Sequence, residues 1–416
     1  MLPSEEAARR LGVKVSTLYA YVSRGLLASH PEPGGRRSLF DLADIERMAT
    51  RQRGGRQAES GLAVVTTGVT QLRPDGPYYR GHPAVDLACT MTFEEVADLL
   101  WGADEGEWVA PDLGDCPLVA VADRMRWALL MCGAHDPARA DLRPAALHRA
   151  ARGIIAALAE VVAAADQEAM TGTNEQSVAP SIALRLAHGL TRRLHGDAAD
   201  QTADQTADHV ADQAARHAAD PQPGRRRSQW VAVLNAALIL MADHELATST
   251  VAVRVAASTR ADLYDALMAG LATLAGPLHG AASQGAYELL VTVERDGAAR
   301  ALTDILSRHD NVPGFGHKIY KERDPRFGPL WELAWPLLSA ERCGLFLEVL
   351  ELAAANGVPP PNCDLALAAL SWGTGMPPDA GRTIFTVARL AGWTAHYQEE
   401  LQEPPLRFRP RAVYSV

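Results

Sequence analysis

Long stretches rich in alanine and leucine, with apolar residues at helical spacing, constrain the fold of this chain more than any other feature. The alternation of apolar and polar residues that is typical of strands is scarce between them, so most of the chain is predicted to be α-helical. A further helix is predicted after Thr92, because Thr92 and Glu95 have the spacing of a capping box and apolar residues follow. The longest stretches lie at 145–165, 180–195, 230–243, 260–275 and 381–395.

Composition and cysteine usage exclude several classes of protein. The 416 residues carry a net charge of −10 and are 48% hydrophobic, which allows two or three domains but not a basic nucleic-acid coat. The longest apolar run, Trp230 to Ala242, is shorter than the roughly 18 to 20 residues of a membrane helix. The first residues lack an apolar signal core, and the five cysteines contain no Cys-x-x-Cys pair. We expect a cytoplasmic chain without a membrane segment, a disulfide framework or a structural zinc site.

Charge is distributed unevenly, with a basic segment ahead of an acidic body. Residues 1–57 contain ten lysines and arginines and six acids, a charge of +4, which leaves −14 on the remainder. Three short helices are predicted there, beginning at Ser4, Ser16 and Asp41. The first helix is predicted to bury Ala7, Ala8 and Leu11. The second is predicted to end at Gly25, with Leu18, Tyr19 and Val22 facing inward. A Pro/Gly turn with two arginines separates the second helix from the third.

This segment, SEEAARRLGVKVSTLYAYVSRGLL followed by GGRRSLFDLADIERM, resembles the N-terminal winged helix-turn-helix of MerR-type regulators. The resemblance implies a domain at 1–57 whose second helix enters the major groove of DNA. It implies contacts to bases or phosphates from Ser16, Thr17 and Tyr19, and contacts to the DNA backbone from Arg24, Arg36 and Arg37. The alternative is a helical appendage that serves only in packing.

Two polar segments interrupt the helical pattern. Residues 51–61 are polar and contain glycine, so we expect a linker there. Residues 196–227 repeat a Thr/Val-Ala-Asp unit with almost no large apolar residue, so we expect a flexible surface insertion. His209 and His217 in this insertion are conceivable metal ligands, but a solvated loop is the favoured interpretation.

Three histidines and one aspartate are candidates for chemistry. His279 and His317 each lie beside glycine, where backbone can approach a ligand closely. His244 lies in the sequence MADHELATST. Asp364 follows a proline run, where a carboxylate can cap a helix or act in catalysis. Taken singly, each of the four has a purely structural interpretation as well.

Together, the segments around these residues resemble citrate synthases. The resemblance covers about residues 61–416 apart from the insertion, and its motifs occur in family order: PYYRGHPAVDLACTMTFEEVADLLW, LNAALILMADHELATSTVAVRVAAST, GPLHG, GFGHKIYKERDPR, PNCD, VARLAGWTAHYQE and RPRAVY. It implies a large helical domain at 58–275 and 376–416. A small helical domain at 276–375 would close over a cleft, exclude water and align the substrates.

The resemblance also implies a role for each matched residue. His279 would hydrogen-bond the thioester carbonyl of acetyl-CoA, Asp364 would remove the methyl proton, and His317 would polarise the keto group of oxaloacetate. Oxaloacetate would be bound by His244, Arg326, Arg389 and Arg409, the last contributed by the partner subunit of a homodimer. Phosphates of coenzyme A would be neutralised by Lys318, Lys321 and Arg323, for which an exposed basic turn is the alternative. Acetyl-CoA is a co-substrate, and the resemblance implies no permanently bound cofactor and no metal.

The sequence departs from the family pattern next to these residues. The changed positions are Met241, Ala247, Ala281, Ser283 and Gln284. Relative to the family pattern, these substitutions remove hydrogen-bonding groups next to the site. They leave the matched acid, base and carboxylate-binding residues in place, so a changed substrate preference or rate is expected. Two alternatives to citrate synthesis stay open. One is 2-methylcitrate synthesis from propionyl-CoA, which differs by one methylene worth about 1 to 3 kcal/mol. The other is a transcriptional regulator whose enzyme-like body senses a metabolite.

Overall fold

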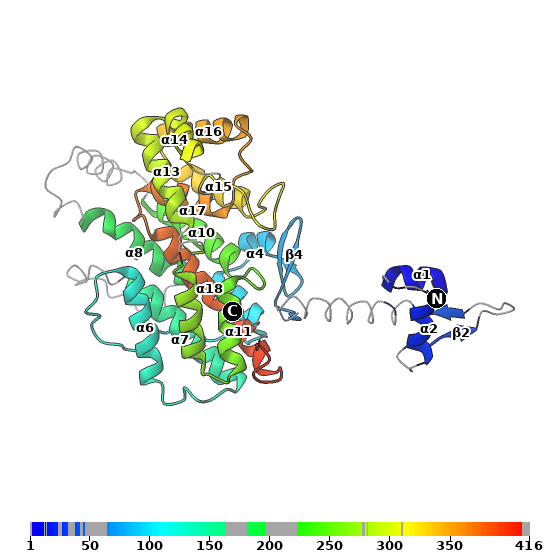
Figure 1. Cartoon of the computed structure of the whole chain (residues 1–416). Helices are drawn as coiled ribbons and strands as arrows, with labels where there is room; N and C mark the ends of the chain where they lie inside the picture. Colours follow the sequence, from blue (N-terminus) through cyan, green and yellow to red (C-terminus); the bar gives the residue numbers. More distant parts are fainter. Residues whose placement is uncertain are drawn as a thin grey trace, which may run out of the picture. The chain divides into compact units, whose positions relative to one another are not determined.

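The computed structural model describes most of the chain, in two compact units. The described residues are 2–11, 13, 15–23, 27–31, 38–41, 45, 65–163, 181–196, 223–276, 279–280, 282–308 and 311–409. One unit comprises Met1–Thr66 with Arg407–Val416, and the other comprises Thr67–Leu406 (Figure 1). We call the second unit the body.

The N-terminal unit combines two described helices with a small sheet. Its elements are α1 (Ser4–Leu11), α2 (Val15–Ser23), β1 (Leu2–Pro3), β2 (His30–Pro31) and β3 (Ser38–Phe40). The strands are antiparallel in the order β1-β3-β2, and β2 with β3 forms the wing that the sequence predicts. This unit has a core of its own, made of Ala7, Ala8, Leu11, Leu18, Leu27, Phe40 and Ile45.

Two details of this unit differ from the sequence prediction. The Ser4 hydroxyl, predicted as a helix cap, lies 2.9 Å from Tyr19 Oη and donates to the Ser38 carbonyl at 3.2 Å, so it joins α2 to the sheet. The Tyr19 side chain is 42% exposed with its ring edge against Phe40, because its hydroxyl is held at the surface by Ser4. Of the other predicted DNA contacts, Thr17 is partly buried. Outside the described residues and side chains lie Ser16, Arg24, Arg36 and Arg37.

The body is helical, as predicted, with one small antiparallel sheet in the order β4-β5-β6. The strands are β4 (Thr70–Arg73), β5 (Gly76–Tyr79) and β6 (His82–Pro83). The helices are α4 (Ala84–Thr90), α5 (Phe93–Trp101), α6 (Val121–His135), α7 (Pro144–Ala163), α8 (Ile182–Gly196), α10 (Pro223–Met241), α11 (Thr248–Ser258), α12 (Leu263–Leu274), α13 (Ala282–Asp296), α14 (Ala298–Arg308), α15 (Phe327–Ala334), η3 (Trp335–Leu337, a 3-10 turn), α16 (Ala340–Ala355), α17 (Cys363–Thr374) and α18 (Ala380–Leu401). None of the helices in the described ranges is long and apolar enough to cross a membrane.

The predicted helices correspond to α7, α8, α10, α12 and α18. The capping box of α5 is present, with the Thr92 hydroxyl accepting from the Glu95 N–H and the Glu95 carboxylate accepting from the Thr92 N–H. Helix α10 begins at Pro223, inside the segment predicted as a flexible insertion. Residues 197–222, which include His209 and His217, lie outside the described part.

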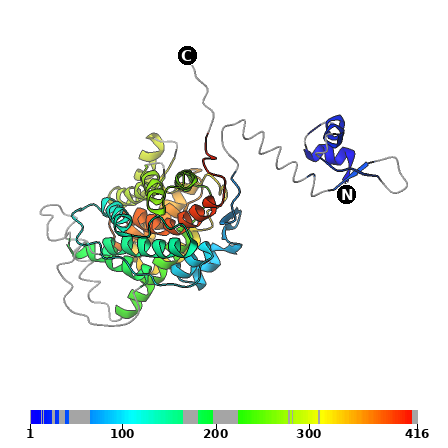
Figure 2. The same cartoon turned by 90° about the horizontal axis from the view of Figure 1, so that it is seen from below.

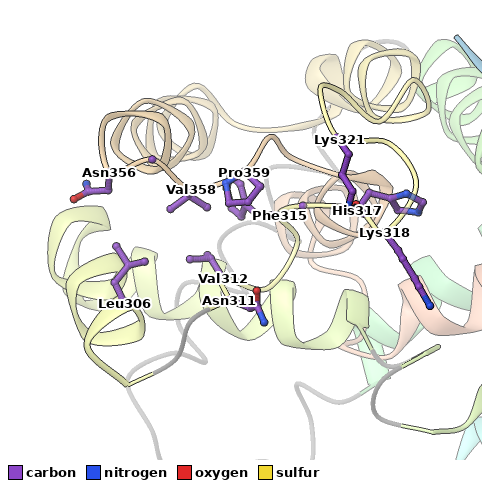
Figure 3. Close-up of a pocket in the computed structure, with 12 residues that line it drawn as sticks. Leu306, Asn311, Val312, Phe315, His317, Lys318, Lys321, Asn356, Val358 and Pro359 are labelled. Atoms are coloured by element: carbon purple, nitrogen blue, oxygen red, sulfur yellow. Dashed lines mark hydrogen bonds between the residues drawn. The ribbon is translucent and has the colours of Figure 1, made fainter. Parts of the chain in front are cut away.

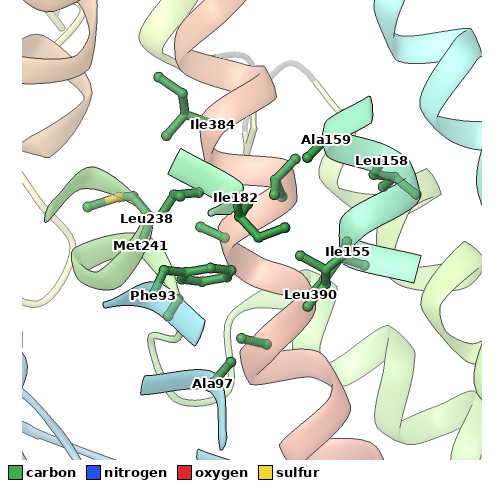
Figure 4. Packing of buried hydrophobic residues seen from close by; sticks show 14 of the residues in the cluster. Phe93, Ala97, Ile155, Leu158, Ala159, Ile182, Leu238, Met241, Ile384 and Leu390 are labelled. Carbon is green, nitrogen blue, oxygen red and sulfur yellow. The ribbon is translucent and has the colours of Figure 1, made fainter. Parts of the chain in front are cut away.

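Helix α18 is the centre of the body. It contacts α5, α7, α10, α11, α12 and α17, and both views show it running through the middle of this unit (Figures 1 and 2). The largest apolar core surrounds it, with Leu390 and Ile384 of α18 near Phe93, Ile155 and Leu238 (Figure 4). A helix with so many partners is buried on nearly every side, and the buried residues of α18 include polar ones such as Arg389 and His396.

Two smaller apolar cores lie among α13, α14, α16 and α17. One contains Leu290, Phe346 and Trp372, and the other contains Val293, Leu302 and Val349. Separate cores agree with the small helical domain predicted for 276–375, whose bounds stay a prediction.

Candidate active site

Backbone hydrogen bonds hold two distant loops of the body side by side. Bonds of 2.8 and 3.0 Å join residues 314–316 to residues 360–362, and one antiparallel bridge lies between them. His317 directly follows the first segment, and Asp364 lies in the first turn of α17 just after the second. The main chain itself therefore brings these two candidates into one region.

Asn362 strengthens the same junction with its side chain. Its oxygen caps α17 by accepting from the Asp364 N–H at 3.0 Å, and its nitrogen donates to the Gly316 carbonyl at 2.7 Å. Gly314 has a φ of 82°, and a Cβ there would lie 2.9 Å from the side chain of Leu365. Gly314 is thus needed for both its backbone conformation and the close packing.

His317 is held as a neutral ring that can donate through Nε2. Its Nδ1 accepts from the backbone N–H groups of Ile319 and Tyr320, each at 3.1 Å, so the ring proton resides on Nε2. Burial, with the nearby Arg326 guanidinium, lowers the pKa of His317 to about 4. The ring stacks on Tyr320 with centroids 4.9 Å apart and meets His244 edge-on at 5.3 Å.

Arg326 lies beside this donor and is clamped by a carboxylate. Its Nη2 is 3.3 Å from His317 Nε2, so the guanidinium and the imidazole adjoin each other. Asp324 binds the guanidinium through both oxygens, at 3.0 and 2.9 Å, and also accepts from the Cys363 N–H at the start of α17. The sequence analysis missed Asp324; its only signal is an acid two residues before Arg326.

Arg389 is a buried cation that forms no direct ion pair with a carboxylate among the described residues. Its side chain is 1% exposed, its Nε donates to the Met241 carbonyl at 2.9 Å, and its guanidinium carbon lies 4.5 Å from the centre of the Phe385 ring. Within the described part of the chain, no carboxylate forms an ion pair with it. The buried Asp243 carboxylate acts on the charge of Arg389 through space, and without a direct ion pair the guanidinium is suited to bind an anionic ligand.

His279 follows α12 and is oriented by a buried serine. Its Nε2 lies 2.8 Å from Ser249 Oγ, which leaves Nδ1 as the nitrogen available to a ligand. Burial, with a contribution from Arg389, lowers the pKa of His279 to about 4. Ser249 lies in the first turn of α11, and the sequence analysis missed it because a serine at a helix start is most often a cap.

The charges of the same two arginines, Arg326 and Arg389, act on the pKa values of His244 and Asp364. Burial, followed by the charges of Arg326 and Arg389, holds the pKa of His244 well below its usual range. Its Nε2 is buried and has no hydrogen-bond partner among the described residues. Burial raises the pKa of Asp364 to about 6, although Arg326 and Arg389 act in the opposite direction. Arg389 also acts on His279, so these three groups share the positive field of Arg389.

A pocket of about 630 Å³ opens beside His317 (Figure 3). Lys318 and Lys321 line it next to His317, and residues 356–359 form the opposite wall. Arg323 is exposed and does not line this pocket. Arg409 is exposed and falls in the unit of Met1–Thr66 with Arg407–Val416, so its place relative to the site is not defined.

Of the five residues that depart from the family pattern, four lie in the described part of the chain. Met241 is fully buried and offers its carbonyl to Arg389, and Ala247 precedes α11 without a side-chain cap. Ser283 is buried, whereas Gln284 bonds within its own helix. Ala281 lies outside the described residues. In the described ranges, no three His, Cys, Asp or Glu side chains are grouped to hold a metal.

Comparison with known proteins gives two family matches. A model of the C-terminal domain of citrate synthase matches residues 58–411, and a helix-turn-helix domain model matches residues 1–53. The chain is 27% identical to citrate synthase 2 of Bacillus subtilis over 85% of this chain and 94% of that protein. It is also 27% identical to 2-methylcitrate synthase of Mycobacterium tuberculosis, over 85% and 89% of the two chains.

Solved structures establish the fold of the body. Citrate synthase of Thermotoga maritima superposes with a TM-score of 0.62 at 22% identity, over 85% of this chain and 94% of that one. The ternary complex of carboxymethyl coenzyme A and oxaloacetate with the citrate synthase of Thermoplasma acidophilum gives a TM-score of 0.64 at 22% identity, with the same coverage.

Proposed function

Because the chain belongs to the citrate synthase family, we propose that its body condenses a short acyl-CoA with oxaloacetate and hydrolyses the thioester to release coenzyme A. The family match covers all the candidate residues from His244 to Arg409. The observation that carries the proposal is the buried guanidinium of Arg389, which forms no direct ion pair with a carboxylate among the described residues and lies near imidazoles held neutral. A dianionic substrate supplies a carboxylate for such a pair.

The first chemical step is proton removal from the acyl-CoA. A thioester methyl group is a poor carbon acid, so a base and a donor must act together. The Asp364 carboxylate takes the methyl proton while His279 donates from Nδ1 to the thioester oxygen, where negative charge develops. Each of these contributions is typically worth about 10² to 10⁴ in rate.

The second step forms the carbon–carbon bond. His317 donates from Nε2 to the keto oxygen of oxaloacetate, so the keto carbon becomes electrophilic and the enol carbon attacks it. Arg326 and Arg389 bind the carboxylates, because a guanidinium forms two parallel hydrogen bonds to one carboxylate. His244 binds the same substrate through its unpartnered Nε2. Water then cleaves the thioester, which makes the reaction irreversible.

The pocket beside His317 is the proposed site for coenzyme A. Lys318 and Lys321 lie on its wall, where their ammonium groups are placed to neutralise phosphates. Arg323 lies two residues further along the same exposed loop and is also assigned to the phosphates of coenzyme A. Lys321 Nζ also donates to the His317 carbonyl at 3.2 Å, which links the phosphate site to the keto-binding site.

We assign Arg409 to the active site of the partner subunit in a homodimer, as the family resemblance implies. Mixed dimers test this assignment. Asp364→Ala and Arg409→Ala are each expected to be inactive, but co-expressed they form dimers in which one site has both native residues. Recovery of thiol release on mixing supports the assignment, and its absence in verified mixed dimers contradicts it.

The acyl group is tested with a substrate panel. The two relatives named above, one a citrate synthase and one a 2-methylcitrate synthase, are equally identical to this chain, so identity does not separate acetyl-CoA from propionyl-CoA. The ratio of kcat/KM for the two thioesters, measured with saturating oxaloacetate, decides between them.

Oxaloacetate-dependent release of free thiol tests the activity itself. Asp364→Ala is expected to lower turnover by at least about 100-fold, because the base is lost. Asp296→Ala, an exposed aspartate on α13, is the matched control and is expected to match the wild type. Absence of thiol release with every short acyl-CoA and 2-oxo acid pair would overturn the proposal.

A second function is favoured by the helix-turn-helix match and by the separate core of the N-terminal unit. In this proposal the N-terminal unit binds DNA and the body senses a metabolite. The DNA contacts are assigned to Ser16, Thr17, Tyr19, Arg24, Arg36 and Arg37. Titration of the full chain against a palindromic fragment and a scrambled fragment tests it. Selective binding that oxaloacetate or citrate changes supports it, whereas salt-sensitive binding that is indifferent to sequence contradicts it.

A further inference from the structure

The turn that carries His244 has a strained backbone closed by its own neighbour. Glu245 has a φ of 54°, in the left-handed region that residues other than glycine rarely adopt. The Glu245 N–H donates to Asp243 Oδ2 at 3.0 Å, so this carboxylate spans His244 and closes the turn. Asp243 therefore sets the backbone conformation from which the His244 imidazole projects.

Asp243 is held in turn by a buried chain of polar groups. Its carboxylate and the His396 ring are both 0% exposed, with His396 Nε2 3.3 Å from Oδ2. His396 Nδ1 lies 2.9 Å from Arg254 Nη1. A guanidinium only donates, so Nδ1 accepts and the ring donates from Nε2 to Asp243. Arg254 is itself fixed by Glu400 at 2.9 Å and Glu399 at 2.6 Å.

Helix α18 approaches the turn at a second point, one helical turn before His396. The Gly392 N–H donates to the Ala242 carbonyl at 3.1 Å. A Cβ on Gly392 would lie 2.3 Å from Asp243 Oδ1 and 2.5 Å from that carbonyl, so no larger residue fits without moving the turn. His396 and Gly392 share one face of α18, and the turn that carries His244 packs against this face.

We propose that Asp243, His396 and Arg254 are positioning residues for oxaloacetate binding. Directed hydrogen bonds run from the guanidinium to the imidazole to the carboxylate, and the carboxylate fixes the His244 turn in its binding conformation. None of the three touches the substrate, and each acts through His244. The inference rests on the proposed function, since the role of His244 as an oxaloacetate ligand is part of that proposal.

Two substitutions at His396 test the chain of hydrogen bonds in the full-length protein. His396→Leu removes both ring nitrogens, whereas His396→Gln keeps one acceptor for Arg254 and one donor for Asp243. His396→Leu is expected to raise the Kd of oxaloacetate, measured by titration calorimetry, by about 10- to 100-fold through misplacement of His244. The KM for acetyl-CoA at saturating oxaloacetate is expected to stay within about twofold. His396→Gln is expected to recover most of the lost affinity.

A buried ion pair elsewhere in the body provides the matched control. Asp98 and Arg152 are 2.8 Å apart, and their side chains are only 11% and 10% exposed, compared with 0% for those of the proposed chain. Asp98→Asn weakens a buried polar contact without touching the 243–245 turn, so it is expected to lower the melting temperature and leave the Kd of oxaloacetate unchanged. An equal rise in Kd for Asp98→Asn and His396→Leu would show a general loss of stability and overturn the proposal.

Glycine substitutions carry the test if His396→Leu does not fold. Gly392→Ala places a methyl group against the turn, and Gly133→Ala places one 2.9 Å from the Tyr264 ring in a different helix pair. Only Gly392→Ala is expected to weaken oxaloacetate binding, and an unchanged Kd for it would overturn the proposal.

His244→Ala distinguishes a failure of the proposed function from a failure of the positioning role. If His244→Ala binds oxaloacetate as tightly as the wild type, the proposed role of His244 is refuted. If His244→Ala binds oxaloacetate more weakly but His396→Leu binds it like the wild type, only the positioning role of the hydrogen-bond chain is refuted.

Discussion

Each imidazole of the site is kept neutral by its surroundings, while the one carboxylate assigned as base is made more basic. Burial lowers the pKa of His279 and His317 to about 4 and raises that of Asp364 to about 6. Neutral rings donate one hydrogen bond without adding positive charge. A carboxylate with a raised pKa is a better proton acceptor, so the two shifts serve the same step.

The raised pKa of Asp364 predicts the acid limb of the pH profile. A general base must be unprotonated, so kcat/KM is expected to rise with pH through about 6 and to fall about tenfold per unit below it. His279 and His317 titrate lower, so they stay neutral through this range. Initial rates between pH 5 and 8 measure the limb. A profile that stays flat down to pH 5 would contradict the assignment of Asp364 as base.

The hydrogen bond from Ser249 predicts a second effect at this scale. Ser249→Ala frees His279 Nε2, so the ring loses its fixed orientation, and kcat is expected to fall roughly tenfold, the equivalent of about 1.4 kcal/mol. Ser371→Ala is the control, because Ser371 is also buried and bonds a helix carbonyl at 2.8 Å. Equal turnover in the two variants would remove Ser249 from the machinery.

The sequence could single out the residues that we assign to chemistry but not those that hold them in place. His279, His317 and Asp364 lie in recognisable motifs, whereas Ser249 and His396 have no local signal. Ser249 meets His279 across 30 residues, and His396 meets Asp243 across 153 residues. Such contacts depend on how helices pack, which a single sequence does not state.

At the scale of elements, the cap of α17 joins folding to function. Asn362→Ala is expected to cost about 1 kcal/mol through loss of the cap, seen as a lower melting temperature. Asn362→Ser keeps an oxygen for the cap but loses the amide that donates to Gly316. Its stability is expected to stay near that of the wild type while kcat falls in both variants. Wild-type kcat in Asn362→Ser would show that the cap alone matters.

Helices were predictable because their apolar spacing is local. The errors occur where a tertiary contact takes over a local group, as when Ser4 bonds Tyr19 and Ser38 in place of capping α1. The start of α10 at Pro223 was missed because the basic residues there, Arg225 to Arg227, have no apolar face.

At the scale of the whole molecule, the uneven charge predicts a separate domain at residues 1–57, which we call the head. The head and the body have separate apolar cores. Deletion of residues 1–57 is therefore expected to leave thiol release within about twofold of the full chain and to abolish any DNA binding. Activity and gel-shift assays on the truncated and full-length proteins measure both. Loss of turnover in a truncated protein that still melts cooperatively would contradict independent units.

The bridge between residues 314–316 and 360–362 has a mechanical consequence. Because it consists of main-chain hydrogen bonds, a rigid rotation of this region would carry His317 and Asp364 along the same path. Their separation would then stay constant while access from solvent changed. Under the proposed function, an enzyme of this kind would open to admit one substrate and close around two without altering the spacing of the two residues assigned to the reaction.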